Sequence, residues 1–261
     1  MNVLEVNSLS VSYYGKTAVN DISFTVPDHK IVAIVGESGS GKSTIVRAIL
    51  KLLSAGGEIA GGEILFHGKD ITTLSDEQMR KIRGKEIAMI FQDAGAYLNP
   101  RLKIGGQYLE TILAHQSTGK AEARELAKKM LFQLKLADPE RIMNSYPFQL
   151  SGGMKQRVAI AMAMSMGPKL LLADEPTSAL DVTVQAQVVR EMMTLRDELG
   201  TSIIIVTHNM GVASRMADYI AVMCEGKLME FGTRDQVIET PKSEYTKMLL
   251  SVVPELKEAK P

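Results

Sequence analysis

A glycine-rich loop constrains the fold of this chain more than any other feature of the sequence. The stretch GESGSGKST at residues 36–44 follows the β-branched run KIVAIVG and leads into STIVRAILKLL, where the apolar residues have helical spacing. Gly36, Gly41, Lys42 and Ser43 fit the pattern G-x-x-x-x-G-K-[ST] between a strand and a helix, which is the context this pattern requires. The sequence therefore predicts an α/β protein with an anion-binding loop; a Gly/Ser-rich turn that fits by chance is the alternative.

The residue types in this loop indicate a nucleotide. Glycines let backbone N–H groups converge on a phosphate, and the positive end of the helix dipole adds to the attraction. Lys42 would reach the β- and γ-phosphates, while the Ser43 hydroxyl would bind Mg²⁺. We therefore expect a nucleoside triphosphate and a magnesium ion at this loop.

Two adjacent acids end the apolar run LLLADEP at residues 170–176. Burying two carboxylates at the end of a strand is costly unless a cation meets them, and Mg²⁺ bound to a nucleotide would do so. Asp174 is then the acid on the metal side, and Glu175 is the base that orients and deprotonates the attacking water. The alternative is that both acids only cap the following turn.

Two further polar residues follow predicted strands. His208 ends SIIIVTH, and Gln92 ends AMIFQ. Because parallel strands bring their carboxyl ends to one edge of a sheet, His208 is placed to contact a γ-phosphate, although a lone histidine there is more often a satisfied polar group. The Gln92 amide could hold a water or Mg²⁺. Because a flexible segment follows it, Gln92 could also shift when that segment contacts a partner.

The order of predicted elements indicates one domain with an insertion. Residues 1–35 alternate with the period of strands, and strands alternate with helices after residue 158, which predicts a parallel sheet with right-handed crossovers. We expect a single nucleotide-binding domain over residues 1–261. Its RecA-like core with an antiparallel β subdomain is expected at 1–93 and 150–232, its helical subdomain at 94–149, and a helical tail at 233–261.

A second helix start offers another anion site. In QLSGGMKQR, Ser151 is a good N-cap, and Gly152 and Gly153 leave the first backbone N–H groups uncovered. Since one nucleotide needs only one lysine loop, we expect this helix start to bind the γ-phosphate of ATP on another copy, so that two chains close two sites between them. An ordinary cap on a buried helix is the alternative.

Composition limits the partners and the compartment. Lys plus Arg and Asp plus Glu number 30 each, so no overall charge favours nucleic acid or an anionic membrane as the main partner. The single cysteine, Cys224, excludes an internal disulfide and fits a reducing compartment. No run of about 18 apolar residues occurs, so the chain is expected to stay on the cytoplasmic side without crossing a bilayer.

These motifs, in this order, resemble those of the ATP-binding subunits of ABC transporters over nearly the whole chain. Residues 36–44 resemble the Walker A loop, LSGGMKQR at 150–157 the signature, LLLADE at 170–175 Walker B and SALD at 178–181 the D-loop, with Gln92 as the Q-loop residue and His208 as the switch histidine. The resemblance implies that Tyr13 stacks on adenine; Tyr14 is the alternative, and either ring could be ordinary strand packing.

The site residues expected from the motifs and the resemblance together fall into three groups. Catalytic roles are expected for Lys42, Gln92, Glu175 and His208. Residues expected on Mg²⁺ are Ser43, Gln92 and Asp174. Residues expected on ATP are Tyr13, Gly36, Ser38, Gly39, Gly41, Lys42, Ser43, Thr44, Ser151, Gly152 and Gly153.

A finer resemblance is to the subfamily that serves oligopeptide, dipeptide and nickel importers. FQDAGAYLNPRLKIGGQ is similar to its extended Q-loop region, and PKSEYTKMLLSVVPEL to its C-terminal segment. Many members bind an iron–sulfur cluster through C-terminal cysteines, and with Cys224 alone no such cluster is expected here. Asn209 stands where the family usually has Asp, which removes a negative charge near the γ-phosphate and affects fine rate control.

The resemblance implies an ATP-hydrolysing motor subunit of an importer. ATP would close two nucleotide domains, and hydrolysis would reopen them and drive uptake of a small solute through separate membrane subunits. The expected partners are a second, non-identical ATPase subunit, two membrane-spanning permease subunits and an external solute-binding protein, with the chain peripheral on the cytoplasmic face of the membrane. The sequence leaves the cargo open between peptide, nickel and another metal chelate.

Two other functions are weighed against this one. An ABC-type ATPase of DNA repair or translation would clamp nucleic acid, but such proteins usually carry a coiled coil, a zinc-binding insert or a second domain, and none lies between Lys42 and Ser151. A regulatory subunit that binds ATP without useful turnover is opposed by the intact Glu175 and His208. The transport ATPase is the favoured function.

Overall fold

The computed structural model describes residues 1–177 and 182–251, so the D-loop expected at 178–181 lies outside the described residues. The chain forms two compact units. One unit contains Met1–Arg80 and the described residues from Ser202 onward, and the other contains Lys81–Thr201. The boundary falls within α2 (Asp76–Ile82) and directly before β8 (Ser202–Thr207), and each unit is described by itself.

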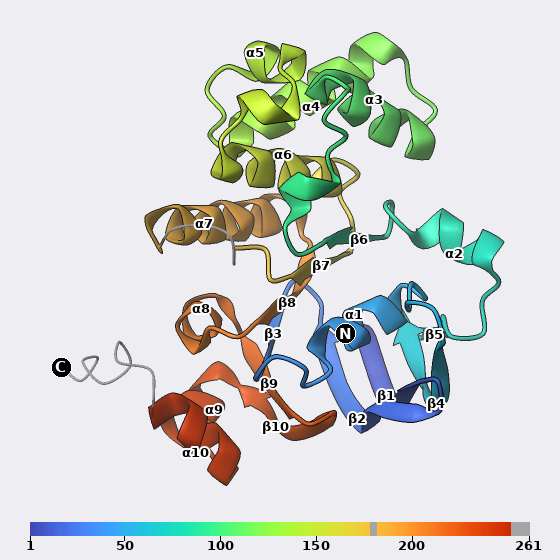
Figure 1. The fold of residues 1–261 in the computed structure, drawn as a ribbon, viewed down its shortest axis with the longest axis vertical. Coiled ribbons are helices and arrows are strands. Elements are labelled where there is room, and N and C mark those ends of the chain that lie inside the picture. The colour runs from blue at the N-terminus through green and yellow to red at the C-terminus, as the bar shows by residue number, and fades with distance from the viewer. Residues whose placement is uncertain (178–181, 252–261) are drawn as a thin grey trace. The chain divides into compact units, whose positions relative to one another are not determined.

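An antiparallel sheet makes up much of the first unit (Figure 1). It contains β1 (Asn2–Tyr13), β2 (Lys16–Pro27), β4 (Gly57–Phe66) and β5 (Lys69–Asp70), in the order β2-β1-β4-β5. β1 and β2 meet in a two-residue turn whose residues, Tyr14 and Gly15, both have positive φ, as a tight hairpin with right-handed strand twist requires. This is the antiparallel β subdomain that the period-two alternation predicts.

The first unit also contains a group of mainly parallel strands. β3 (Ile31–Val35) pairs in parallel with β8 and with β9 (Tyr219–Cys224), and β10 (Lys227–Thr233) pairs antiparallel with β9. All five residues of β3 are buried, as expected for a strand covered on both faces. The helices of this unit that follow these strands are α1 (Lys42–Ile49), α8 (Met210–Met216), α9 (Arg234–Glu239) and α10 (Glu244–Ser251).

The second unit pairs two parallel strands with a group of helices. β6 (Ile87–Ile90) pairs with β7 (Leu170–Asp174). The helices are η1 (Ala94–Tyr97), α3 (Ile104–His115), α4 (Lys120–Gln133), α5 (Pro139–Asn144), η2 (Pro147–Gln149), α6 (Gly152–Met164) and α7 (Val182–Leu199). Helix α6 contacts β6 as well as α3 and α4, so the helix that begins at the LSGG stretch connects the helical group to the strands.

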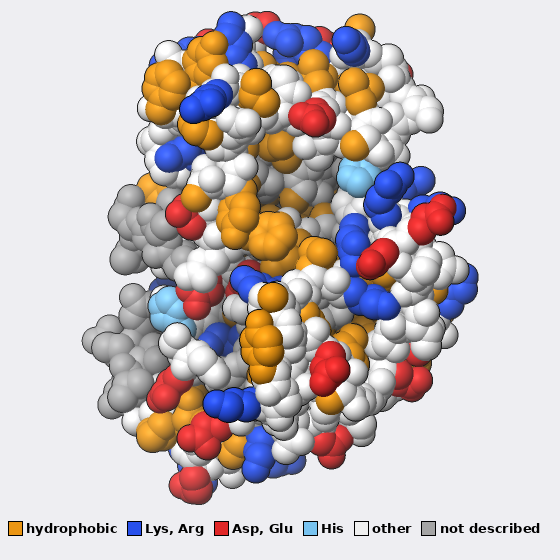
Figure 2. All heavy atoms as spheres, turned by 45° about the vertical axis from the view of Figure 1, so that its right-hand side comes forward, with side chains coloured by type: hydrophobic (Ala, Val, Ile, Leu, Met, Phe, Trp, Pro, Cys, Tyr) orange, Lys and Arg blue, Asp and Glu red, His pale blue; other side chains and the backbone are white. Residues whose placement is uncertain are grey.

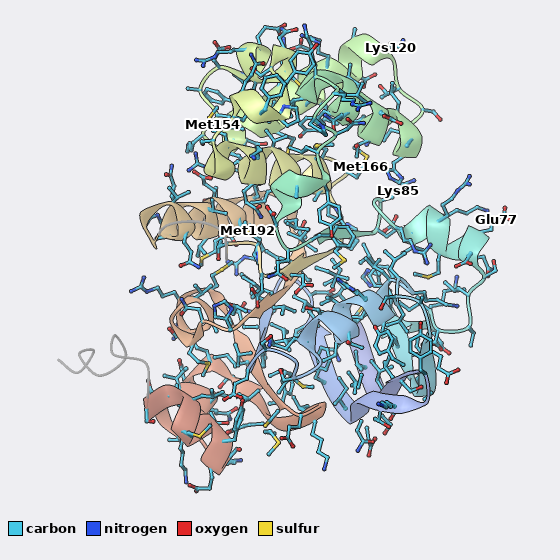
Figure 3. The ribbon with its side chains drawn as sticks, viewed as in Figure 1. Glu77, Lys85, Lys120, Met154, Met166 and Met192 are labelled. Atoms are coloured by element: carbon cyan, nitrogen blue, oxygen red, sulfur yellow. The ribbon has the colours of Figure 1, made fainter. Side chains whose placement is uncertain are left out.

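A buried tyrosine connects helices α3 and α6 of the second unit. Tyr108 of α3 is fully buried, and its hydroxyl lies 2.8 Å from the Ser165 hydroxyl at the end of α6. Burial raises the pKa of Tyr108, and the smaller effect of the Ser165 contact lowers it, so this phenol stays neutral. Met154 near the start of α6 and Met166 just beyond its end are labelled in Figure 3; both are half-exposed, whereas Met164 is buried.

The fold class is the one the sequence predicts: an α/β fold with parallel strands, an N-terminal antiparallel β subdomain and a helical insertion. The α-helices α3 to α5 and the short helices η1 and η2 fall inside the range 94–149 expected for the helical subdomain, whose boundaries stay a prediction. Within residues 1–177 and 182–251, no helix combines the length and the apolar character needed to cross a membrane.

Candidate functional site

The first unit carries the glycine-rich loop between β3 and α1. The backbone of Gly36 has φ +152°, and a Cβ there would lie 2.1 Å from the Met223 carbonyl oxygen of β9, so only glycine fits. Gly41 has φ +97° and forms the N-cap of α1, where no side chain caps the helix. The loop therefore keeps the amino end of α1 clear of side-chain acceptors, as a phosphate site requires.

Lys42 occupies the interior of this loop. Its side chain is buried, and Nζ donates to the Gly36 oxygen at 2.8 Å, to the Glu37 oxygen at 2.6 Å and to Ser40 Oγ at 3.3 Å. A buried ammonium held by backbone carbonyls at an uncapped helix start concentrates positive charge at one point. The residues present therefore fit a phosphate group.

The remaining loop residues surround this charge. Ser38 and Gly39 are exposed, and the space where a Gly39 Cβ would stand is open. Ser43 and Thr44 are half-exposed in the first turn of α1. A ligand can therefore approach the loop from the Gly39 side.

His208 follows β8 in the same unit and is exposed. The next residue, Asn209, is the N-cap of α8: its side-chain oxygen accepts from the amides of Gly211 at 2.8 Å and Val212 at 3.2 Å. The amide thus fills a structural role that a carboxylate could also fill, because Asn and Asp are comparable N-caps. The substitution keeps the backbone next to His208 fixed while removing one negative charge.

The two tyrosines at the end of β1 both pack on a glycine-containing turn. Tyr13 is half-buried, with its ring against Gly57, and Tyr14 is 79% exposed, with its ring over Gly56. Tyr14 also has φ +50° in the hairpin turn. The strand-packing alternative therefore describes Tyr13 in this structure, whereas Tyr14 is mostly exposed in the turn. The adenine contact expected of Tyr13 stays a prediction.

The second unit carries the acids and Gln92. Asp174 ends β7 with 2% of its surface exposed, and Glu175 follows with φ +45°. Gln92 comes two residues after β6, and its Nε2 lies 3.4 Å from Glu175 Oε2. The parallel pairing of β6 and β7 thus brings Gln92 and Glu175 together, as the sequence predicts, through a long hydrogen bond.

The donor set expected for Mg²⁺ is a hydroxyl, an amide and one carboxylate. In the described parts of the chain, no group of three or more His, Cys, Asp or Glu residues could hold a metal ion alone. Mg²⁺ usually keeps several waters and is bound by one or two protein groups together with phosphate oxygens. Taken one by one, Ser43, Gln92 and Asp174 each carry an oxygen that could bind an ion arriving with a nucleotide, and their joint use stays a prediction.

The LSGG stretch begins α6 in the way the sequence predicts. Ser151 is the N-cap, and its Oγ accepts from the Met154 amide at 3.3 Å. Ser151 and Gly152 are exposed, and nothing lies within 4 Å of a Cβ placed on Gly152. Ser151 thus caps the helix, and Gly152 beside it is exposed, so the structure is compatible with both alternatives.

Sequence reasoning missed two contacts that tie α6 to its neighbours. Gln156 is buried and donates to the Pro176 oxygen, just after Walker B, at 2.6 Å. Arg157 Nε lies 3.0 Å from Glu191 Oε2 of α7, and both side chains are largely buried. The sequence did contain a signal for these contacts, because polar residues interrupt the apolar face of α6. Buried polar groups are nearly always hydrogen-bonded or paired with a charge, so partners for them could have been expected.

Comparisons with known proteins identify the family of this chain. Residues 19–178 match the family model described as ABC transporter. The oligopeptide transport ATP-binding protein OppD of Bacillus subtilis (strain 168) is 45% identical, over 97% of this chain and 72% of that protein. The dipeptide transport ATP-binding protein DppD of the same organism is also 45% identical, over 97% of this chain and 77% of that protein.

A solved structure supports the same family. It is the dimeric, post-hydrolysis state of the ATP-binding cassette MJ0796 bound to ADP and Pi. It aligns with a TM-score of 0.77 at 29% identity, and the alignment covers 88% of this chain and 98% of that one. Fold and loop together define an ATP-binding cassette that hydrolyses ATP.

The chain belongs to the ABC transporter family. It is an ATP-hydrolysing subunit of an importer, which confirms the function expected from the motifs at the level of the transport ATPase.

Proposed function

We propose that this chain hydrolyses ATP at residues 36–44, Asp174, Glu175 and His208 and uses the energy to drive uptake of peptides. The observation that carries the proposal is the buried Lys42 ammonium inside an uncapped helix start. The names of the relatives OppD and DppD, which refer to oligopeptide and dipeptide transport, favour peptides over the nickel or metal-chelate cargo that the sequence also allowed.

Each residue takes a role in a single displacement. The loop amides and Lys42 bind the β- and γ-phosphates, and Tyr13 stacks on the adenine. Glu175 takes the proton of a water that attacks the γ-phosphorus, and the bond from that phosphorus to the bridging oxygen of ADP breaks. Gln92 and His208 orient the water and the γ-phosphate. Mg²⁺ bound through Ser43, Gln92 and Asp174 would neutralise charge on the phosphate oxygens.

The second anion site suggests that two cassettes act together. Ser151 and Gly152 are exposed at the start of α6, yet the lysine loop is elsewhere in the chain. The dimeric structure of MJ0796 supports a pair of cassettes. In the pair proposed for this chain, each LSGG stretch meets the nucleotide on its partner. As the subfamily resemblance implies, the partner in the complete transporter is a second, non-identical ATPase subunit.

A groove in the second unit suits a membrane partner. Its volume is about 550 Å³, and its lining includes Phe91, Tyr97, Leu98, Leu102 and Met162. Figure 2 shows a hollow on one face with hydrophobic side chains gathered around it. Since Phe91 precedes Gln92 directly, a segment seated in this groove could move Gln92 against Glu175. We propose that a membrane-spanning permease subunit docks here.

The subfamily resemblance implies the rest of the proposed assembly. Two permease subunits form the pathway, an external solute-binding protein delivers the peptide, and the chain is peripheral on the cytoplasmic face of the membrane. Nucleic acid has no place in the cycle; ATPase activity raised by nucleic acid without a membrane partner would favour the repair or translation alternative instead.

Substitution of Glu175 tests the proposal. Glu175→Gln should lower turnover by roughly 10² to 10⁴, as loss of a general base does, and leave ATP binding intact. Glu125→Gln, an exposed acid of α4 in an i,i+3 pair with Lys128, is the matched control and should turn over normally. Normal turnover in Glu175→Gln would remove Glu175 from the role of base, and a wild type that binds ATP but never hydrolyses it would favour the regulatory alternative.

Light scattering of the Glu175→Gln protein tests the pairing. A dimer that forms only with Mg-ATP, and that Ser151→Arg abolishes, is the expected result if one chain pairs with itself. A monomer in every condition would require the non-identical partner, which should then be found with the purified membrane complex. A dimer that Ser151→Arg leaves intact would refute the role of the LSGG stretch.

A further inference from the structure

Glu175, the proposed general base, has a strained backbone. Its φ of +45° lies in the left-handed region, which residues with a side chain rarely adopt. Glu175 also precedes Pro176, and the residue before a proline favours an extended conformation. A strained conformation persists only where the surrounding structure holds it, so the segment around Glu175 must be anchored.

Two glutamines from neighbouring helices anchor the residues after Glu175. Gln156 of α6 donates from Nε2 to the Pro176 oxygen at 2.6 Å, and Gln185 of α7 donates from Nε2 to Thr177 Oγ1 at 2.8 Å. Helices α6 and α7 are in contact within the second unit (Figure 1). Gln156 and Thr177 are 6% and 4% exposed, so water does not readily replace either hydrogen bond.

The anchor at Pro176 acts directly on the backbone of Glu175. The proline ring fixes φ of Pro176 near about −65°. The peptide bond between Glu175 and Pro176 is trans, and Gln156 holds the carbonyl on the other side of the ring. Little rotational freedom therefore remains between this hydrogen bond and the α-carbon of Glu175.

The strand before Glu175 supplies a second fixed end. Asp174 is the last residue of β7 and is 2% exposed, and the pairing of β7 with β6 extends to Ala173. The hydrogen bond from Gln92 Nε2 to Glu175 Oε2 is 3.4 Å long and therefore weak. The direction in which the Glu175 side chain leaves the backbone is thus set by β7 on one side and by Gln156 on the other.

We infer that Gln156 is a positioning residue for the general base, holding the Pro176 carbonyl so that the Glu175 carboxylate points at the attacking water. This inference rests on the proposed role of Glu175 in ATP hydrolysis. A displacement of about 1 Å can lower turnover by roughly 10²-fold, because a base must lie within hydrogen-bond reach of the proton that it takes. Gln156 donates to the backbone and is not among the residues expected on ATP, so its loss should change kcat and not nucleotide affinity.

Gln156→Leu tests the inference in the full chain, because leucine is similar in size and has no side-chain N–H. Its kcat should fall by roughly 10- to 100-fold while the Kd for Mg-ATP is unchanged. Gln133→Leu is the matched control: it removes the same kind of amide, whose Nε2 donates to Glu198 Oε2 at 2.7 Å between α4 and α7, and it should leave both values unchanged. A normal kcat in a folded Gln156→Leu protein would refute the inference.

A second comparison separates positioning of the base from general support of the fold. In the Glu175→Gln background the base is absent, so Gln156→Leu should cause little further loss of single-turnover hydrolysis. A role in the fold alone would lower hydrolysis by the same factor in both backgrounds, or would weaken ATP binding. Either of those results would contradict the inference.

If Gln156→Leu does not fold, Gln156→Asn takes its place. This variant keeps an amide at the position, but its side chain is one methylene shorter and cannot form the 2.6 Å hydrogen bond to Pro176. The same loss of kcat at an unchanged Kd is expected, with circular dichroism to check the fold. A Gln156→Asn protein with the kcat of the wild type would overturn the inference.

Glu175→Gln alone separates the two proposals. If that variant turns over normally, Glu175 is not the base, and the proposed mechanism of hydrolysis fails. If Glu175→Gln lowers turnover while Gln156→Leu behaves as wild type, only the positioning role of Gln156 fails.

Discussion

Gly36→Ala should cost the first unit about 2–6 kcal/mol of stability, although it adds a single methyl group. A Cβ at this position would lie 2.1 Å from the Met223 carbonyl oxygen, and such contacts essentially never fall below 3.0 Å, so one partner must move by roughly 1 Å. The carbonyl belongs to β9, which is paired with β3 and cannot rotate away. Overpacking contributes about 1–3 kcal/mol, and φ +152° in a residue with a side chain about 1–3 kcal/mol more.

Gly39→Ala is the matched control, because it lies in the same loop with φ +81° but has nothing within 4 Å of its Cβ position. Gly39→Ala should lower the free energy of unfolding only by the cost of placing a side chain at positive φ, about 1–2 kcal/mol. Urea unfolding followed by circular dichroism measures both costs, and nucleotide binding shows whether the loop has shifted. Equal destabilisation by the two substitutions would show that the Met223 contact does not control the loop.

Two more predictions concern buried and half-buried charges. Arg157→Met and Glu191→Met should each cost about 3 kcal/mol, because each leaves a buried charge unpaired, and the double substitution should cost less than either; additive costs in urea unfolding would refute this. Glu230 has a lowered pKa: burial, the largest influence, raises it, but the donors at the start of α10 together outweigh burial. The stabilisation by Glu230 is therefore present above the unfolded pKa of about 4.3 and is lost as pH falls through the lower folded pKa. The wild type should therefore have a higher unfolding midpoint than Glu230→Gln at neutral pH, and this difference should disappear in acid. A difference that does not change with pH would contradict the role of the Glu230 carboxylate.

Local patterns account for the parts of the site that were predictable. Three features each depend on a few residues that are neighbours in the sequence: the glycine loop, the acids at the end of β7 and the cap at Ser151. The chemistry of each short group of residues points to one role. The alternation of apolar and polar residues in β1 and β2 was visible for the same reason, because a strand places successive side chains on opposite faces and its own residues show this period. Gln92 and Glu175 could be brought together because parallel strands share an edge.

Contacts between distant segments were not predictable in this way. The strand β4 (Gly57–Phe66) pairs along β1, from Leu4↔Phe66 to Tyr13↔Gly57, although the two strands are far apart in the sequence. Nothing in either strand specifies its partner, because many apolar strands present a similar face.

The two alternatives for Ser151 can be separated, because a cap and a phosphate site respond differently to charge. Its Oγ accepts from the Met154 amide, so Ser151→Ala should lose about 1 kcal/mol of stability whether or not a nucleotide binds there. Ser151→Asp keeps a capping oxygen and places a favourable negative charge at the helix start, so its stability should match the wild type. The same charge repels a γ-phosphate, so the ATP-dependent dimer of the Glu175→Gln protein should be lost in Ser151→Asp. Thermal unfolding and light scattering measure the two effects separately. If Ser151→Asp is stable and still dimerises with Mg-ATP, the LSGG stretch is only a cap, and the closed pair must be held together elsewhere.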